Sequence, residues 1–585
     1  MSKILKFKLT ISLFFLSILI FSFLILSLFA SYSGTYHGSL MNTWQYALGQ
    51  YSYAKDVFLQ DNIFTETSII FSLFSFLKIN MTNDFVGFAW HIFLSLLSGI
   101  FLFKILKEFT LLKDINLLLV ILFSLLAIDG KFFLVDSNYA SWMIRHTGTT
   151  SHIGHSLIFV FFWALLKEKN IFLIILTPIM LLISVKSTFF SIGIGMLYSL
   201  FFYEGIKKKL WILSPIATIL YMSSINVYSG TNDYETNKIL FDHLIEREGE
   251  EASFHLQPKI KIFLFLISFP IFYFLTNKLD NEKLKKLSKI ILFSSFLCFL
   301  WGYFYHLYGG KFWPEPKLAA LGPTRAVEVY ELFFAVLLAL FINKINTAVI
   351  IKIGLYCLLY YVPYGFKGTI VGLSIFIFIL IFSFIYKKFE FNFFKEIFLE
   401  KMGKFNNLAT ALFFLLLFPS VIYTISTKEF DTYALKKISK WKTGPLYGEH
   451  SKIDSAVLLQ KCDDFILLDP TGKNWTNVIA GKSQYVDFTR LGINLFSIKL
   501  HNLMKERGPV YEDIVKSIDE GNLISQNTHN RLIKDGVVLL VKKENIRSFS
   551  SNVKKINLNS NDMLILFLDE KEEKLFSKNC LNKIL

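Results

Sequence analysis

The sequence predicts a mainly α-helical, polytopic membrane protein with about 13 transmembrane helices and a C-terminal extracytoplasmic α/β domain. Three observations predict this class. Of the 585 residues, 53% are hydrophobic and 64 are Phe, which is too apolar for a soluble protein of this length. Lysines recur in short clusters between the apolar stretches. After residue 426 the apolar blocks shorten to strand length.

The predicted spans follow from the requirement of roughly 20 apolar residues each, with shorter ones accepted where helices pack together. Leu9–Phe29 exceeds a signal-peptide core of about 7–15 residues, so we interpret it as an uncleaved anchor with a cytoplasmic N-terminus. The other predicted spans are Val86–Phe103, Ile115–Leu134, Ile153–Leu166, Ile171–Val185, Phe189–Tyr203, Trp211–Val227, Ile260–Leu275, Ile290–Tyr305, Val327–Ile342, Ala348–Val362, Ile370–Tyr386 and Ala409–Tyr423.

The positive charge fits this layout. The net charge is +16, but alternate connections carry the lysines, which is the pattern of cytoplasmic loops and not of a nucleic-acid-binding surface. The lysine-rich connections are Lys104–Lys113, Lys167–Lys169, Lys207–Lys209, Lys278–Lys289, Lys344 and Lys387–Lys404. Residues 1–426 are therefore expected to form the transmembrane domain, with a long first external loop at 31–83, and residues 427–585 a periplasmic, extracytoplasmic domain.

The C-terminal part alternates between strand-like and helical stretches, which is typical of a small α/β domain. Strands are expected at Asp464–Leu468, Gly536–Lys542 and Met563–Leu568, and helices at Ile493–Lys505 and Tyr511–Ile518. Cys462 and Cys580 can form a disulfide if the C-terminus folds back on the first strand, and the sequence leaves their pairing open. Cys298 and Cys357 fall within predicted spans, as packing residues.

The first external loop, Ser31–Asn83, contains an amphipathic helical pattern followed by two carboxylates, Asp56 and Asp61. The apolar positions that define the pattern are Leu40, Trp44, Ala47, Leu48 and Tyr51. One interpretation places this helix along the membrane surface or beneath a cap domain, with its polar residues at the mouth of the membrane domain. The other is an ordinary extramembrane loop.

Basic residues and histidines at other external positions complete the set of candidate site residues. They are Arg145, His146, His152, His155, Lys186, His243, Arg247, His255 and Arg325. A carboxylate beside such groups suits activation of an acceptor and stabilisation of an anionic leaving group, and the same basic groups also bind lipid phosphates without chemistry. His152 and His155 have the spacing of half a metal site, but no carboxylate stands at the matching offset, so a hydrogen-bonding or phosphate-contacting role is favoured over metal binding.

Several segments resemble the GT-C superfamily of membrane glycosyltransferases, in particular an uncharacterised bacterial group. The segment Tyr53–Asp61 is similar to that group's first-loop acidic element, and Gly322-Pro-Thr-Arg325 is similar to the start of one of its later spans. Tyr485-Val-Asp-Phe-Thr-Arg490, followed by Glu506-Arg507, resembles the strand and helix of its exported domain. The order of loops and spans is similar over nearly the whole chain.

This resemblance implies transfer of a sugar from a polyprenyl-phosphate donor to a glycan, lipid or protein acceptor on the outer face of a bacterial cytoplasmic membrane. It also implies that Asp56 or Asp61 is the general base, or a carboxylate assisting a metal, and that Arg145, Lys186 and Arg325 neutralise the lipid phosphate. Cofactors are unknown, and a role for a divalent cation is left open. Two alternatives also stay open: a flippase or polymerase for a lipid-linked glycan, and a non-catalytic membrane scaffold in envelope assembly. Apart from Lys186 the spans carry few charges, which weighs against a transporter.

Overall fold

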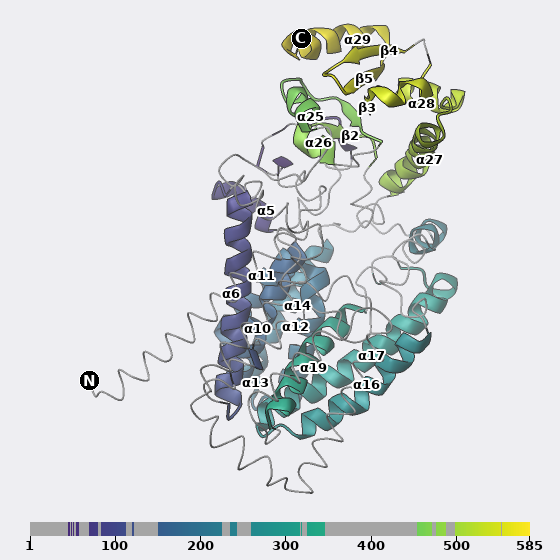
Figure 1. Cartoon of the computed structure of the whole chain (residues 1–585). Coiled ribbons are helices and arrows are strands. Elements are labelled where there is room, and N and C mark those ends of the chain that lie inside the picture. The colour runs from purple at the N-terminus through teal and green to yellow at the C-terminus, as the bar shows by residue number, and fades with distance from the viewer. Residues whose placement is uncertain are drawn as a thin grey trace, which may run out of the picture.

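The chain folds into a helical bundle with a small α/β domain at one end (Figure 1). The computed structural model describes residues 45–46, 48–49, 51, 54–57, 69–79, 84–112, 117, 120–121, 150–224, 234–242, 259–315, 318, 324–344, 453–470, 475–486, 498–550 and 553–584. The described structure is mostly helical, and its single sheet lies in the C-terminal part.

Helices occur at eight of the predicted spans. They are α6 (Asp84–Phe109), α9 (Thr150–Ser156) with α10 (Ile158–Leu166), α11 (Asn170–Ile183), α12 (Val185–Phe202), α14 (Leu213–Ser224), α16 (Lys259–Asn277), α17 (Glu282–Phe312) and α19 (Thr324–Lys344). Within the described ranges, α17 alone is both long and apolar enough to cross a membrane by itself. The predicted spans Leu9–Phe29, Ala348–Val362, Ile370–Tyr386 and Ala409–Tyr423, and most of Ile115–Leu134, lie outside the described residues.

An aromatic core joins α16, α17 and α19. Tyr330 is fully buried, and its ring stacks on that of Phe272 with centroids 4.7 Å apart. The Tyr330 hydroxyl forms a 2.7 Å hydrogen bond with the hydroxyl of Ser268, so its polar atom is satisfied within the apolar core. Phe162 of α10 meets Phe333 edge to face at 5.1 Å. This contact joins α10 to α19.

The lysine-rich connections meet at one end of the bundle. Glu168, in the turn between α10 and α11, accepts ion pairs from Lys208 at 2.6 Å and Lys283 at 2.7 Å. Hydrogen bonds from these two lysines lower the pKa of Glu168. Lys344 pairs with Asp280 at 2.8 Å, which brings a further connection to the same end. In Figure 1, α13 (Ile206–Lys209) marks this end, opposite the C-terminal domain.

The break between α11 and α12 lies inside the bundle. Ser184 has extended backbone angles, φ −160° and ψ 100°, and separates two helices that both return to the lysine-rich end. At a rise of about 1.5 Å per residue, the 14 residues of α11 place this break about 21 Å from that end. The predicted spans Ile171–Val185 and Phe189–Tyr203 leave residues 186–188 between them, and the structure places the break at Ser184 instead.

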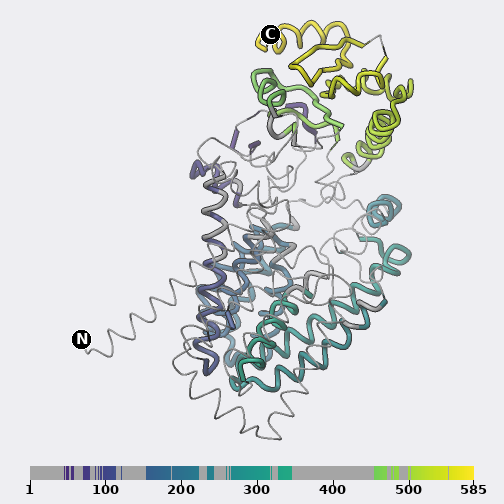
Figure 2. The backbone as a smooth tube through the Cα atoms, in the orientation of Figure 1, coloured from purple at the N-terminus to yellow at the C-terminus, as the bar shows by residue number. Residues whose placement is uncertain are grey.

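The C-terminal domain, coloured green to yellow in Figure 2, contains a five-stranded sheet in the order β2-β1-β3-β5-β4. The strands are β1 (Ile466–Leu468), β2 (Ser483–Gln484), β3 (Val537–Lys542), β4 (Lys554–Asn557) and β5 (Asp562–Phe567). Strand β1 pairs in parallel with β2 and β3, whereas β5 is antiparallel to β3 and β4. The three predicted strands are confirmed to within two residues. Two apolar cores, one on each face, bury the sheet.

The helices of this domain are α25 (Ile453–Leu459), α26 (Trp475–Ala480), α27 (Ile498–Glu520), α28 (Gln526–Asp535) and α29 (Glu570–Phe576). The prediction of two separate helices at 493–505 and 511–518 is wrong, because α27 continues through Pro509. Val510 and Ile514, just after the proline, pack into the core on one face of the sheet. This apolar burial offsets the helix-breaking effect of the proline ring.

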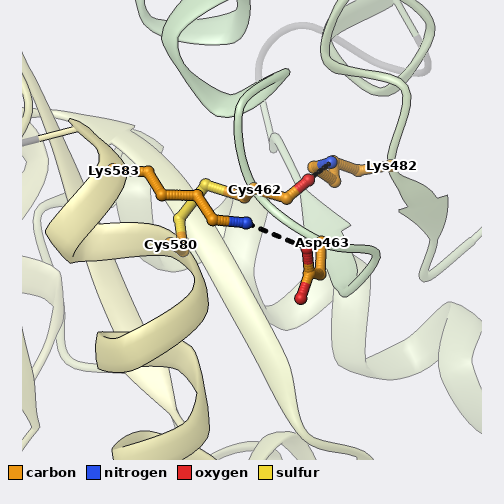
Figure 3. The surroundings of a disulfide bond; sticks show 5 residues. All are labelled: Cys462, Asp463, Lys482, Cys580 and Lys583. Carbon is orange, nitrogen blue, oxygen red and sulfur yellow. Dashed lines mark hydrogen bonds and ion pairs between the residues drawn. A yellow bond between two sulfur atoms is a disulfide. The ribbon is translucent and has the colours of Figure 1, made fainter.

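A disulfide joins Cys462, just before β1, to Cys580 in the C-terminal helical turns (Figure 3). The C-terminus therefore folds back on the first strand, which is the condition the sequence set for this pairing. Beside the bond, Lys482 donates a 2.7 Å hydrogen bond to the Cys462 carbonyl, and Lys583 pairs with Asp463 at 3.2 Å. Of the other two cysteines, Cys298 is a free thiol in α17 and Cys357 lies outside the described residues.

Candidate functional site: a junction between the first loop and the α/β domain

The first loop binds the edge of the C-terminal sheet. Asp56 is fully buried, and its carboxylate accepts a 3.2 Å hydrogen bond from the backbone amide of Gln484 in β2. The neighbouring amide of Lys55 donates to the Asp464 carboxylate at 2.9 Å. Asp464 also accepts from the amide and hydroxyl of Ser483, at 3.0 and 2.6 Å. The loop thus satisfies polar groups along an edge strand that would otherwise be open.

Apolar contacts reinforce the junction. Val57 packs against Leu500 of α27. Tyr51 lies over Gly481, which precedes β2 and has a left-handed φ of +63°, so a Cβ at this position would overlap the Tyr51 ring. Glycine is therefore required here both by its backbone conformation and by the closeness of the first loop.

The amphipathic helix predicted through Tyr51 is interrupted in the structure. Gly49 adopts a left-handed φ of +65°, and its amide donates to the Tyr46 carbonyl at 3.0 Å, which is the geometry of a tight turn. Tyr51 therefore belongs to the segment that contacts the domain and does not continue the helix.

A charged cluster joins Tyr485, which directly follows β2, to helices α27 and α28. Arg507 of α27 stacks on the ring of Tyr485, with 4.6 Å from the guanidinium carbon to the centroid, and donates to the Tyr485 carbonyl at 3.0 Å. Asp535 accepts from the Tyr485 hydroxyl and from Arg531, both at 2.9 Å. Burial lowers the pKa of Arg507, while the negative charges of Asp535 and Asp56 oppose this shift. The Asp56 carboxylate thus belongs electrostatically to this cluster.

A second group of polar side chains lies inside the bundle, where α9 packs against α6, α11 and α12. His155 of α9 is buried, as are Ser98, Ser184 and Thr188. Ser98 donates to the Ser156 carbonyl at 3.3 Å, and Thr188 donates to the Ser184 carbonyl at 2.8 Å. These residues form a polar zone beside the α11–α12 break, within otherwise apolar helices.

A third contact joins two predicted external loops. Residues 234–242 are helical and pack on the end of α17, where the Tyr234 hydroxyl donates to the Lys311 carbonyl at 3.0 Å. Gly310 lies so close to this helix that a Cβ there would stand 3.0 Å from the Asp242 carboxylate oxygen. The contact places the chain leading to His243 at the end of α17 remote from Lys283.

The structure describes the side chains of two predicted site residues, Asp56 and His155, and places them at separate positions. Asp56 lies at the domain junction and His155 in the polar zone. His152, Lys186 and Arg325 belong to α9, α12 and α19, and their side chains are not described. Asp61, Arg145, His146, His243, Arg247 and His255 lie outside the described residues. Among the described residues, no group of three or more His, Cys, Asp or Glu has the geometry of a metal site.

Sequence reasoning missed the partners of the first loop. Gln484, the donor to Asp56, stands 428 residues away along the chain, and Asp464, the acceptor for the Lys55 amide, stands 409 residues from Lys55. The one local signal was the Tyr485 segment with Glu506-Arg507, which the resemblance assigned to a strand and a helix. In the structure Tyr485 directly follows β2, and Arg507 lies in α27.

The fold and the site define a helical bundle with an α/β domain that is locked to the bundle's first loop. Comparison of the chain with protein-family models, curated proteins and solved structures finds no match.

Proposed function

We propose that the chain is a multi-pass membrane glycosyltransferase of the GT-C type, which transfers a sugar from a polyprenyl-phosphate donor to an envelope acceptor. The observation that carries the proposal is the binding of the acidic first-loop segment to the α/β domain, through Asp56 and Gln484. The resemblance predicts these two parts as separate features of such an enzyme. Their direct contact supports a shared site at that end of the bundle.

The outer surface of the helices supports membrane embedding. On α11, Ile171, Ile175 and Ile179 are 78%, 58% and 40% exposed and stand four residues apart, so they form one apolar stripe. Leu213 and Leu220 form a similar stripe on α14, 62% and 65% exposed. Large apolar side chains on the outside of an apolar bundle fit lipid and not water. We propose thirteen spans, with the lysine-rich end in the cytoplasm.

The two acidic residues of the first loop receive different roles. Asp56 is buried and engaged by a backbone amide, so we assign it to positioning the loop. Asp61 follows five residues later in the sequence and is our candidate base. The base removes the proton of the acceptor hydroxyl, whose oxygen bonds to the anomeric carbon as the sugar–phosphate bond breaks. Arg145, Lys186 and Arg325 are candidates to neutralise the departing lipid phosphate.

A non-catalytic scaffold in envelope assembly is the second candidate. The full burial of Asp56 favours the scaffold, because a buried carboxylate that accepts a hydrogen bond from a backbone amide stabilises the junction without any role in catalysis.

Envelope glycan profiling in a deletion strain, complemented with each variant, separates the two candidates. We expect Asp61→Asn to abolish one glycan species at an unchanged membrane level, because the substitution removes a base and keeps nearly the same shape. Asp61→Glu, which keeps the carboxylate, is the matched control and should retain part of the activity. A normal profile from Asp61→Asn would leave the scaffold as the better account.

A further inference from the structure

The lysine-rich end of the bundle carries lysines close in the chain and in space to exposed large apolar side chains. We define the basic apolar patch as Lys207, Lys209, Lys286, Phe201 and Ile206. Phe201 lies in the last turn of α12 and is 67% exposed, and Ile206 begins α13 and is 80% exposed. The patch lies where α12, α13 and α17 meet.

Two lysines of the patch, Lys209 and Lys286, are held by neighbouring groups that carry no negative charge. Lys209 donates a 2.9 Å hydrogen bond to the Leu200 carbonyl, and the Lys286 ammonium lies 5.0 Å from the centroid of the Phe202 ring. Among the described residues, no carboxylate forms an ion pair with Lys207, Lys209 or Lys286.

Of the nearby carboxylates, Glu168 is already engaged by lysines outside the patch. Glu168 is shared by Lys208 and Lys283, at 2.6 and 2.7 Å. Glu204 acts on Lys208 by raising its pKa, a smaller effect than that of Glu168. The patch therefore keeps a local excess of positive charge.

We propose that this patch binds an anionic phospholipid, with the headgroup phosphate on the lysines and an acyl chain along Phe201 and Ile206. Charge complementarity specifies the headgroup, and the exposed apolar residues specify the chain. A free phosphate ion would leave Phe201 and Ile206 facing water. The proposal depends on the bundle being embedded in a membrane and is independent of sugar transfer.

The experiment uses the full-length protein in nanodiscs of mixed phosphatidylcholine and phosphatidylglycerol. Native mass spectrometry measures the ratio of the two lipids that remain bound. We expect phosphatidylglycerol to be enriched over the bulk ratio. The triple variant Lys207→Gln, Lys209→Gln, Lys286→Gln should lower that enrichment about tenfold, whereas arginine at the same three positions should retain it.

The matched control removes three exposed lysines from the C-terminal domain, by Lys571→Gln, Lys574→Gln and Lys578→Gln. An equal loss in this control, or no loss in the patch variant, would overturn the proposal. So would inorganic phosphate that stabilises the wild-type protein against heat as much as phosphatidylglycerol does. If the glutamine variant fails to fold, the salt dependence of enrichment in the wild type decides, because headgroup binding must weaken as salt rises. Failure of the wild-type protein to enter nanodiscs would contradict the membrane assignment itself.

Discussion

Asp56 and Gln484 are 428 positions apart in the chain, yet the Gln484 amide donates a 3.2 Å hydrogen bond to the Asp56 carboxylate. Both residues are buried, with Asp56 0% and Gln484 1% exposed. The contact joins the edge strand β2 to a segment of the first loop, which precedes α6 in the chain. The α/β domain therefore includes part of the first loop.

Replacing Asp56 by Ala should open this junction. The Gln484 amide would lose its acceptor while it remains buried, which costs about 1–3 kcal/mol. Hydrogen exchange of the full-length protein should show faster exchange in the peptide that contains Gln484. Asp463→Ala is the control, because Asp463 is exposed and should leave that peptide unchanged.

The contact between Tyr51 and Gly481 gives a second test of the same junction. Gly481→Ala should destabilise it through both the positive φ and the overlap with the Tyr51 ring, and the backbone part alone costs about 1–2 kcal/mol. Adding Tyr51→Ala should restore part of the protection, because it removes the overlap. If the effects of Gly481→Ala and Tyr51→Ala on the protection are additive, the Tyr51 ring does not contact residue 481, and this account of the junction is wrong.

The disulfide should be present in the protein as isolated. Peptide mapping without reduction should recover the peptides of Cys462 and Cys580 as one cross-linked species. Replacing either cysteine by Ser should destabilise the domain by about 2–5 kcal/mol, since the bond closes a long loop. Replacing both should cost no more than replacing one. Two free thiols in unreduced protein would contradict this pairing and would count against the extracytoplasmic location that we propose for the domain.

Lys482 should make the stability of the domain depend on pH. Burial lowers its pKa from 10.5 to about 8. Between these values the unfolded chain holds the proton that the folded domain releases, so stability should increase as pH rises from about 8 towards 10.5. Denaturant midpoints of wild type and Lys482→Met measure this effect. The Lys482→Met variant should lack the rise in stability with pH. An identical rise in the variant and the wild type would mean that another titrating group causes it.

The sidedness of the bundle can be tested directly. The ion pairs of Glu168 with Lys208 and Lys283 bring three lysine-rich connections to the end opposite the C-terminal domain. Reporter fusions after residue 404 and after residue 427 should therefore report opposite sides of the membrane. The same side for both would overturn the count of thirteen spans.

The sequence predicted those features of the fold that depend on local patterns. The apolar blocks at 536–542 and 563–568 became β3 and β5, shifted by one residue, because buried central strands read as continuous apolar runs. Strand β4 was missed because its sequence, Lys-Lys-Ile-Asn, is that of a charged edge strand. Strand β2 was missed because it has two residues, and so short a stretch cannot show the alternation of apolar and polar residues that marks a strand.

The site was less predictable because its contacts are non-local. Asp56 was identified as important from its neighbours in the first loop, but the pattern carried no information on Gln484 or Asp464. His155 was identified from a cluster of basic residues, and the structure buries it in α9, next to Ser156, whose carbonyl accepts a hydrogen bond from Ser98. Which residues meet in such a bundle is decided by tertiary packing, and spacing along the chain does not encode it.

The most direct test of the glycosyltransferase proposal is the level of the donor lipid in cells. Lipid extracts from a deletion strain complemented with wild type, Asp61→Asn or Asp61→Glu are analysed by mass spectrometry for polyprenyl-phosphate-linked sugars. We predict that one such lipid accumulates with Asp61→Asn and returns towards the wild-type level with Asp61→Glu, because only the carboxylate variants can consume it. Equal amounts of every polyprenyl-phosphate-linked sugar in the deletion strain and in all three complemented strains would contradict the proposal.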